Sequence, residues 1–372
     1  MSRNFIVIEG SKKFFDETVN YLCNNSNYPS DFSRIIETID AFKKNGLIFD
    51  EPVDVLAIKN ISYHGINNEA HYGIGEIIET ITTDNAIVYI HNPTLILWNY
   101  LNFSNYVKDK DNYFCEKYLI KTEDEDFKKN VNILANKVVG QQEALQEILK
   151  SIWYLSKSSR KKPYVIMLYG GSSLGKTETV REIARMFFEN KFFEKYLSMF
   201  MNNTYTDYFF GDRPNSKSLA FDLYERESNL IFFDEFDKCS NIFYSAFYTL
   251  FDNVTFMDNS YKVDVSSTII ILTSNFHSEE EMKVALGLPI YYRIDKFINY
   301  QPLDIQSILQ ITKNEIENRK DEFIDICSVD EFYSLVSRKI KVENENGRTI
   351  KKKVQETIED LIFTKSFGKY FK

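Results

Sequence analysis

The chain contains the stretch Tyr164-Val-Ile-Met-Leu-Tyr-Gly170-Gly-Ser-Ser-Leu-Gly175-Lys176-Thr177, an apolar run followed by a glycine-rich turn. A continuous apolar run that begins after Pro163 predicts a strand buried on both faces of a parallel sheet. The residues that follow predict a helix, because one helical stripe holds Val180, Ile183, Ala184 and Phe187. The spacing G-x-x-x-x-G-K-T between a strand and a helix is typical of a phosphate-binding P-loop.

The residue types in this turn suit the binding of a nucleotide phosphate. Glycines let the loop wrap, so that its N–H groups and the helix N-terminus point at the β-phosphate. Lys176 reaches the β- and γ-phosphate oxygens, and the Thr177 hydroxyl is a candidate Mg²⁺ ligand. The predicted phosphate-binding residues are Gly170, Gly171, Ser172, Ser173, Leu174, Gly175, Lys176 and Thr177.

Two later apolar runs also end in polar side chains. Residues 229–233 predict a second buried strand, which ends in Asp234 and Glu235. An acidic pair at the end of a strand neighbouring the P-loop would place Asp234 on the Mg²⁺ shell and Glu235 where it polarises water. Residues 268–272 predict a third strand followed by Thr273-Ser-Asn275. We expect Asn275 at the same edge of the sheet, beside the γ-phosphate.

The first hundred residues predict a small, separate α/β domain. Short apolar runs at 5–8, 54–58 and 86–90 predict strands. Amphipathic stripes predict a helix around residues 15–23, another after Ser30 and Asp31, and two more at 74–81 and 93–101. Because no motif here indicates catalysis, we expect a recognition or docking domain without enzymatic activity.

Two features of this region resemble functional sites only in part. Gly73-Ile-Gly75 begins a dinucleotide fingerprint, but Ile78 stands in place of the third glycine, so we expect a turn. His64, His71 and His91 have no metal-binding spacing, and we expect them at the surface or hydrogen-bonded.

Length and composition limit the remaining possibilities. A chain of 372 residues is long enough for two or three domains. Its net charge of −9 gives no general electrostatic footprint for nucleic acid or an anionic membrane. No apolar run is long enough for a signal peptide or a bilayer span, so we expect a cytoplasmic protein. Neither a disulfide framework nor a zinc site is indicated by the four scattered cysteines, Cys23, Cys115, Cys239 and Cys327.

Charge and periodicity divide the chain into parts. Residues 121–130 are a charge run with one apolar residue, which we take as the linker between domains. We therefore predict an N-terminal domain at 1–120, an α/β core at 131–300 and a helical lid at 301–372. Two apolar stripes predict that residues 301–372 are helical, one with Ile305, Ile308, Leu309 and Ile316 and one with Ile350, Val354, Ile358, Leu361 and Ile362. That these helices form a lid is implied by the family resemblance given next.

Taken together, these motifs resemble the Clp-type AAA+ ATPases, most closely the second ATPase domain of ClpB disaggregases. The resemblance runs from Val138 to about Phe363. The motifs that carry it are Val138-Val-Gly-Gln141, the Walker A segment Gly170–Thr177, the Walker B segment Leu230–Glu235 with Asp237-Lys238, the sensor 1 segment Thr273-Ser-Asn275, Arg293-Ile-Asp295, and the sensor 2 segment Gly347-Arg348.

The resemblance implies hydrolysis of ATP with Mg²⁺ in a hexamer-like ring or filament, with a chaperone-like action. It assigns adenine contact to Val138 and Val139, and the catalytic carboxylate to Glu235. Asn275 would position the attacking water. Arg293 would be a finger donated in trans to a neighbouring subunit, and Arg348 would sense the γ-phosphate from the lid.

The sequence departs from this family in two places. The G-Y-V-G pore loop of the family is missing, and the corresponding stretch, 208–219, is shorter. Phe209 or Phe210 could replace it, although an aromatic pair beside a glycine more often belongs to a core. The N-terminal domain matches no Clp N-domain and is expected to bind a protein partner. Three functions therefore stay open: a protein-remodelling ATPase, a slow nucleotide-dependent switch or scaffold in defence or signalling, and, disfavoured by charge, a nucleic-acid motor.

Overall fold

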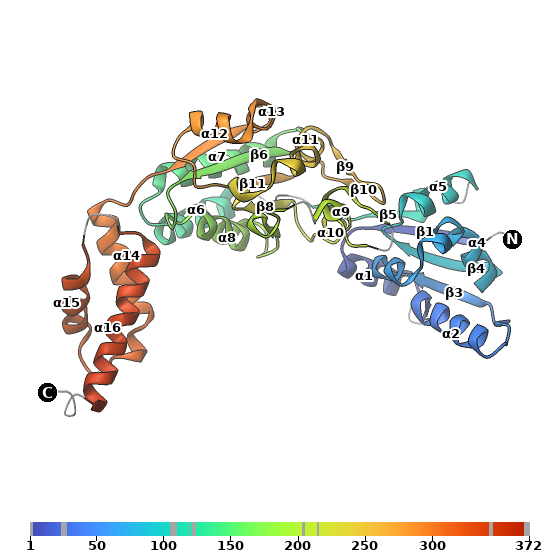
Figure 1. Ribbon diagram of the computed structural model, residues 1–372, viewed down its shortest axis with the longest axis horizontal. Coiled ribbons are helices and arrows are strands. Elements are labelled where there is room, and N and C mark those ends of the chain that lie inside the picture. The colour runs from blue at the N-terminus through green and yellow to red at the C-terminus, as the bar shows by residue number, and fades with distance from the viewer. Residues whose placement is uncertain are drawn as a thin grey trace.

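The computed structural model describes residues 3–23, 28–104, 110–118, 120, 124–202, 205–213, 216–341 and 345–367. An N-terminal α/β domain, a central α/β domain and a C-terminal helical domain follow one another along an elongated arc (Figure 1). This is the predicted fold class, a parallel α/β core with a helical lid, preceded by a small α/β domain. None of the described helices is both long and apolar enough to cross a bilayer.

The N-terminal domain is built on a five-stranded parallel sheet with the order β2-β3-β4-β1-β5. Its strands are β1 (Asn4–Glu9), β2 (Ser30–Asp31), β3 (Val53–Ile58), β4 (Thr82–His91) and β5 (Tyr113–Cys115). Its helices are α1 (Lys12–Leu22), α2 (Phe32–Lys44), α3 (Asn68–Tyr72), α4 (Ile74–Ile81) and α5 (Leu95–Phe103). The longer elements agree with the prediction, whereas β2 and β5 were too short to give a periodic pattern.

The expected turn at Gly73-Ile-Gly75 is wrong for Gly75, which lies inside α4. Its missing side chain allows close packing of α5, because a Cβ atom there would lie 2.5 Å from ring atoms of Tyr100. This glycine therefore serves helix packing and forms no dinucleotide loop.

Two of the three histidines in this domain bond to the backbone, as expected. The Nε2 atom of His71 lies 2.8 Å from the Tyr63 carbonyl oxygen, and that of His91 lies 2.9 Å from the Gly10 carbonyl oxygen. The third, His64, packs its ring against Phe221 of the central domain, with 4.7 Å between ring centroids.

The charge run placed in the linker at 121–130 is helical over its larger part. Residues 124–130 form the first half of α6 (Asp124–Lys137), and 121–123 lie outside the described residues. The one apolar residue of the run, Phe127, anchors this helix, because its ring packs against Trp153 and Phe187 with centroids 4.8 and 5.1 Å apart. The central domain therefore begins earlier than the predicted residue 131.

The central domain contains a second five-stranded parallel sheet with the order β12-β6-β11-β8-β7. Its strands are β6 (Tyr164–Gly170), β7 (Phe193–Tyr196), β8 (Leu230–Asp234), β11 (Ile269–Thr273) and β12 (Lys296–Tyr300). The predicted strand carrying the acidic pair, β8, is not a neighbour of the P-loop strand β6, because β11 lies between them. Sequence proximity does not determine strand order, which is set by the crossover connections.

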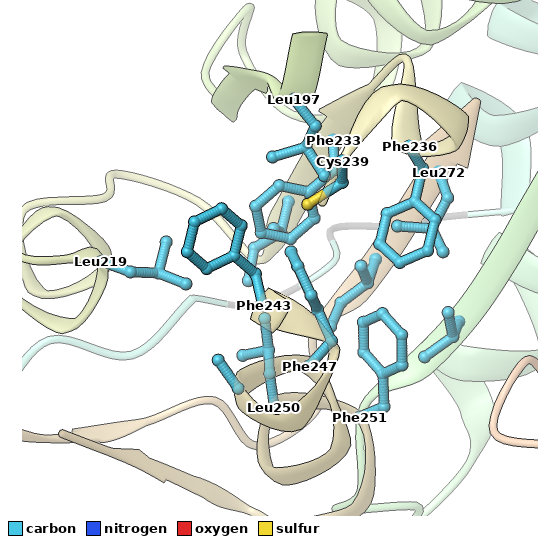
Figure 2. Packing of buried hydrophobic residues seen from close by; sticks show 14 of the residues in the cluster. Leu197, Leu219, Phe233, Phe236, Cys239, Phe243, Phe247, Leu250, Phe251 and Leu272 are labelled. Atoms are coloured by element: carbon cyan, nitrogen blue, oxygen red, sulfur yellow. The ribbon is translucent and has the colours of Figure 1, made fainter. Parts of the chain in front are cut away.

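Both faces of this sheet are buried, as continuous apolar strands require. On β8, Ile231 and Phe233 face one hydrophobic cluster, while Leu230 and Phe232 face another. Figure 2 shows the first cluster, where the aromatic rings of Phe233, Phe243 and Phe247 gather around the start of a helix. The covering helices include α7 (Gln142–Lys157), α8 (Lys176–Phe187), α10 (Leu219–Tyr224), α11 (Tyr244–Asp252), α12 (Glu279–Leu286) and α13 (Leu288–Tyr291).

Phe209, one of the two aromatic residues considered as a replacement for the pore loop, belongs to this core. It lies in the short helix α9 (Thr206–Phe210), is 1% exposed and stacks on Phe243 with 4.3 Å between ring centroids. Phe210 is partly buried against the same cluster. An antiparallel hairpin of β9 (Thr255–Met257) and β10 (Lys262–Asp264) lies close to this helix.

The C-terminal domain consists of α14 (Ile305–Asn318), α15 (Val329–Lys339) and α16 (Gly347–Phe367). The predicted stripe of α14 is wrong in part, because Ile305 and Leu309 are exposed. The buried stripe instead runs through Ile308, Thr312 and Ile316, each four residues apart. The stripe predicted for α16 is buried at its first three positions, Ile350, Val354 and Ile358.

Candidate nucleotide site

The glycine-rich turn between β6 and α8 adopts the backbone conformations that its residues allow. Gly170 has φ 131°, and a Cβ atom there would meet the Tyr300 carbonyl oxygen at 2.4 Å. Gly175, which precedes the first residue of α8, has φ 96°. Ser173 also has a positive φ, 63°. The turn is therefore a tightly wrapped loop at the N-terminus of a helix, which is the geometry that binds phosphate.

Lys176 folds back over this loop. Its ammonium donates to the carbonyl oxygens of Gly170 and Gly171 at 2.9 and 2.8 Å, and to Asn275 Oδ1 at 3.4 Å. Burial lowers the pKa of Lys176 to about 8, and the nearby carboxylates of Asp237 and Asp234 act against that shift. Among the described residues this buried cation makes no direct contact with a carboxylate, which suits it to an anionic ligand.

A hydroxyl and a carboxylate lie beside the lysine. Thr177 Oγ1 is 3.2 and 3.1 Å from the two carboxylate oxygens of Asp234, which ends β8. These are hard oxygen ligands of the kind that Mg²⁺ prefers when phosphates and water complete its coordination. No group of three or more metal-binding side chains occurs among the described residues. The pair therefore fits a metal that arrives with a nucleotide, not an all-protein metal centre.

Thr273 is a site residue that the sequence analysis did not single out. Its hydroxyl donates to Asp234 Oδ1 and accepts from the backbone N–H of Glu235 at 3.0 Å. The side chain is 2% exposed and ends β11, whose Leu272 pairs with Phe233 of β8. The sequence signal for Thr273 was a polar β-branched residue at the end of an apolar strand. Its partners, Asp234 and Glu235, could not be predicted without knowing the strand order.

Glu235 lies just beyond β8 in an unusual backbone conformation, φ 57° and ψ 46°. Left-handed backbone is rare for a residue other than glycine and concentrates at functional sites. The residue is half-buried and begins the short helical turn Phe236–Lys238. Within that turn, the Asp237 side chain is 6% exposed and forms an ion pair with Lys238 at 3.2 Å. The turn that follows Asp234 along the chain therefore carries two further acidic residues, Glu235 and Asp237.

Val138 and Val139 lie where the central domain meets the helical one. Val138 is 7% exposed, and Val139 is half-buried. The following Gly140 has φ 79°, and a Cβ atom there would be 2.7 Å from Ser307 Oγ of α14. The amide of Gln141 then holds the chain entering the lid, since it donates to the Gln301 carbonyl oxygen at 2.8 Å and accepts from the Gln301 N–H at 3.2 Å.

The start of α16 approaches the glycine-rich loop from the lid side. A Cβ atom on Gly347 would lie 3.8 Å from the Ser173 carbonyl oxygen. Asn346 caps the helix, accepting from the Arg348 N–H at 3.0 Å, and the Arg348 side chain is exposed. The structure therefore brings the predicted residues of the loop, of β8, of β11 and of the lid to one region.

Arg293 is the exception, because it lies at the opposite edge of the sheet. Arg293 precedes β12, and the Asp295 N–H donates to the carbonyl oxygen of Val165 near the start of β6. The phosphate loop instead follows Gly170, at the other end of β6. With 7 residues in β6, the two edges are about 20 Å apart at about 3.3 Å per residue. The guanidinium is paired with Asp252 and lies over the ring of Tyr248, 4.7 Å from its centroid.

Comparison with known proteins identifies the central domain. A family model described as AAA domain (Cdc48 subfamily) matches residues 161–325. The chain contains a Clp-type AAA+ domain. The chaperone protein ClpB of Clostridium perfringens is 26% identical over 239 residues, which is 55% of this chain and 28% of that protein. ClpB of Wolinella succinogenes is 24% identical over 220 residues, and ClpB of Helicobacter hepaticus is 26% identical over 207 residues.

The similarity is confined to part of each protein. The chain spans about a quarter of the length of the curated relatives it matches, because it covers 28%, 25% and 24% of them. The AAA+ match includes the glycine-rich loop, Asp234, Asn275 and Arg293, while Val138, Val139 and Arg348 lie outside residues 161–325. For these three residues, the predicted roles rest on the motif resemblance and, for Arg348, on the approach of Gly347 to Ser173 in the loop.

Proposed function

We propose that this chain binds ATP with Mg²⁺ and hydrolyses it in an oligomer, coupling turnover to the remodelling or assembly of a protein partner. The observation that carries the proposal is a pair of hydrogen bonds at the end of a parallel sheet, one from Lys176 to Asn275 and one from Thr177 to Asp234. Relatives named as chaperones and the AAA+ match support the same activity.

In this proposal, each side chain has one task. Lys176 and the loop N–H groups hold the phosphates, and Thr177 and Asp234 hold Mg²⁺, which neutralises phosphate charge when bound. Glu235 accepts a proton from the attacking water, and Asn275 orients that water. Val138 and Val139 contact the adenine, while Arg348 approaches the γ-phosphate from the lid. Gln141 links the adenine side of the pocket to the lid through its two hydrogen bonds to Gln301.

We propose further that a neighbouring subunit completes the site with Arg293, in a hexamer-like ring or filament. The position of Arg293 at the opposite edge of its own sheet supports donation between subunits, since it is about 20 Å from its own loop. An arrangement in which one face of a subunit meets a different face of the next generates rings or filaments. The partner protein would bind through the N-terminal domain.

A second candidate function is a slow nucleotide-dependent switch that does not thread polypeptide. It is favoured by the burial of Phe209, which leaves this aromatic side chain unable to grip a substrate. It is also favoured by hydrogen bonds that fasten the end of α9 to the neighbouring hairpin, where Asn259 donates from its N–H to Phe210 and from its amide to Gly211. Sizing the protein with and without a slowly hydrolysed ATP analogue, and identifying what co-purifies, separates the two functions.

The decisive experiment compares ATP binding and hydrolysis in two variants. Glu235→Gln should bind ATP while hydrolysis falls on the order of 100- to 10,000-fold, because the proton acceptor is lost but the phosphate contacts are kept. Lys176→Ala should instead weaken binding, because the loop loses its cation. Calorimetry measures the first quantity and phosphate release the second. Normal turnover by Glu235→Gln would refute the proposed catalytic assignment.

A further inference from the structure

The carboxyl edge of the N-terminal sheet gathers buried polar side chains. The strands β1, β3 and β4 run parallel, so their last residues meet at one edge, which is where open α/β sheets bind ligands. The buried side chains at this edge, each at most 2% exposed, are Ser11, Asn60, His91, Asn92 and Thr94. None of these residues belongs to the nucleotide site described above.

A carboxylate from the AAA+ domain occupies this edge. Glu225, directly after α10, accepts from the Lys12 N–H with one oxygen and from Asn60 Nδ2 with the other, both at 3.1 Å. Lys12 is the first residue of α1, an 11-residue helix whose N-terminus favours an anion. Burial raises the pKa of Glu225, while the hydrogen bonds from Asn60 and Lys12 lower it. The two donors thus offset part of the cost of burying the carboxylate.

The neighbouring polar groups at this edge leave Lys12 and Asn60 as the donors to Glu225. The Ser11 N–H already bonds a carboxylate of the domain itself, Glu116, at 2.7 Å. Burial lowers the pKa of His91 to about 4, so its ring is neutral at neutral pH, and its Nδ1 is 3.9 Å from Glu225. Asn60 is 1% exposed, and its Oδ1 has no hydrogen-bond partner among the described residues. The Asn60 side chain therefore contacts Glu225 through its Nδ2 donor.

We propose that the carboxyl edge of the N-terminal sheet is a carboxylate-binding site, that Glu225 is its ligand, and that this contact latches the N-terminal domain to the AAA+ domain. The ligand class is a side-chain carboxylate presented at the end of a helix. The site uses the donors at which α/β domains commonly bind small anions, and here they hold a second domain of the same chain.

Other contacts show that the latch is one part of a polar interface. The Leu95 N–H donates to the Ser260 carbonyl oxygen at 2.8 Å, and Tyr224 donates to Glu9 at 3.0 Å. Beside them, a cavity of about 260 Å³ is lined by residues of both domains, among them Glu9 and Tyr224. Polar interfaces of this kind permit relative motion of domains, in contrast to a close-packed apolar one.

The two AAA+ residues of these contacts lie on the segments that lead into the site strands. Glu225 precedes β8, which ends at Asp234, and Ser260 lies in the hairpin that precedes β11, which ends at Thr273. The latch and the Ser260 contact therefore lie on segments that lead into two strands whose opposite ends carry site residues.

Hydrogen exchange of the full-length protein, read by mass spectrometry without nucleotide, tests the latch separately from ATPase activity. The variants are Glu225→Ala, Glu225→Gln and the control Glu227→Ala. Glu227 is on the same loop, and its ion pair with Lys191, 3.6 Å, stays within the AAA+ domain. We expect exchange to rise about tenfold or more at Lys12 and at Leu95 in both Glu225 variants, because losing a charge-assisted contact opens the interface. The glutamine variant opens because its NH₂ group faces one of the two donors.

The outcomes decide the proposal. Faster exchange at Lys12 alone would make Glu225 a local helix cap and overturn the latch. If Glu225→Gln left exchange at Lys12 and Leu95 unchanged, carboxylate recognition would be overturned. If Glu227→Ala raised exchange at these residues as much as the Glu225 variants do, the effect would come from any change in this loop, and the latch would be overturned. Protection of β8 should be unaltered in every variant, which confirms that the AAA+ domain stays folded.

Discussion

Thr273 connects two carboxyl-bearing residues of the nucleotide site. Its hydroxyl donates to Asp234 and accepts from the Glu235 N–H, so it fixes the proposed Mg²⁺ ligand and the left-handed backbone of Glu235 at once. Residues that orient a metal ligand through a hydrogen bond affect metal binding although they do not touch the metal.

We predict that Thr273→Val lowers Mg²⁺-dependent ATP turnover, with an increase of roughly 10- to 100-fold in the Mg²⁺ concentration needed for half-maximal activity. Valine keeps the shape of threonine but leaves Asp234 with only the Thr177 side-chain contact among the described residues and removes the acceptor of the Glu235 N–H. Thr273→Ser, which keeps the hydroxyl, should stay close to wild type. Titration of activity with Mg²⁺ at saturating ATP measures the effect.

The control for this prediction is Thr268→Val. Thr268 is equally buried, but its hydroxyl donates at 2.8 Å to the Val265 carbonyl oxygen, at the start of β11, away from the site. If both valine variants shifted the Mg²⁺ requirement equally, the effect would be a general loss of stability, and Thr273 would have no positioning role.

At the scale of helices and strands, the sequence was most informative where a pattern is local. The apolar runs of β6, β8 and β11 and their polar ends at Lys176, Asp234 and Asn275 could all be predicted, because burial on both faces leaves a continuous signal. Strand order could not, since it depends on crossovers that place β11 between β6 and β8. For the same reason, the partners of Thr273 and the docking of Glu225 were not predictable.

The packing of α4 against α5 depends on the absence of a side chain at Gly75. The ring of Tyr100 fills the space where a Cβ atom would be, with contacts of 2.5 Å to its ring atoms, and its hydroxyl donates to Glu79 at 2.5 Å. Gly75→Ala should therefore destabilise the N-terminal domain by about 1–3 kcal/mol, the usual cost of overpacking. Denaturant unfolding followed by hydrogen exchange of this domain measures the loss.

Gly65→Ala serves as the matched control in the same domain. A Cβ atom there meets nothing within 4 Å, and its backbone needs no glycine-specific φ. It should leave stability within about 0.5 kcal/mol of wild type, as surface substitutions usually do. If Gly75→Ala were equally neutral, the close contact of Tyr100 with α4 would be relieved by rotation of the ring, and Gly75 would have no packing role.

At the scale of the whole molecule, Arg293 and the glycine-rich loop lie on opposite edges of one sheet, so a subunit cannot complete its own site with this residue. In the isolated chain, Arg293 pairs with Asp252, which also binds Lys162 at 2.8 Å. Assembly would have to exchange the Asp252 contact for the phosphate of a neighbour. Arg293→Ala should therefore bind ATP almost normally while hydrolysis falls roughly a thousandfold, the size of known arginine-finger effects.

Mixing two inactive variants tests whether the arginine acts between subunits. In a co-assembly of Arg293→Ala with Glu235→Gln, some interfaces join an intact Glu235 pocket to an intact Arg293 from the other variant. Random assembly at equal concentrations makes about a quarter of the interfaces of this kind, because each pocket faces one donor in a head-to-tail ring. Phosphate release should therefore return to a substantial fraction of the wild-type rate. Rescue needs both assembly and donation in trans, so mixtures that stay as inactive as the separate variants at assembling concentrations would refute the shared site and favour the slow switch.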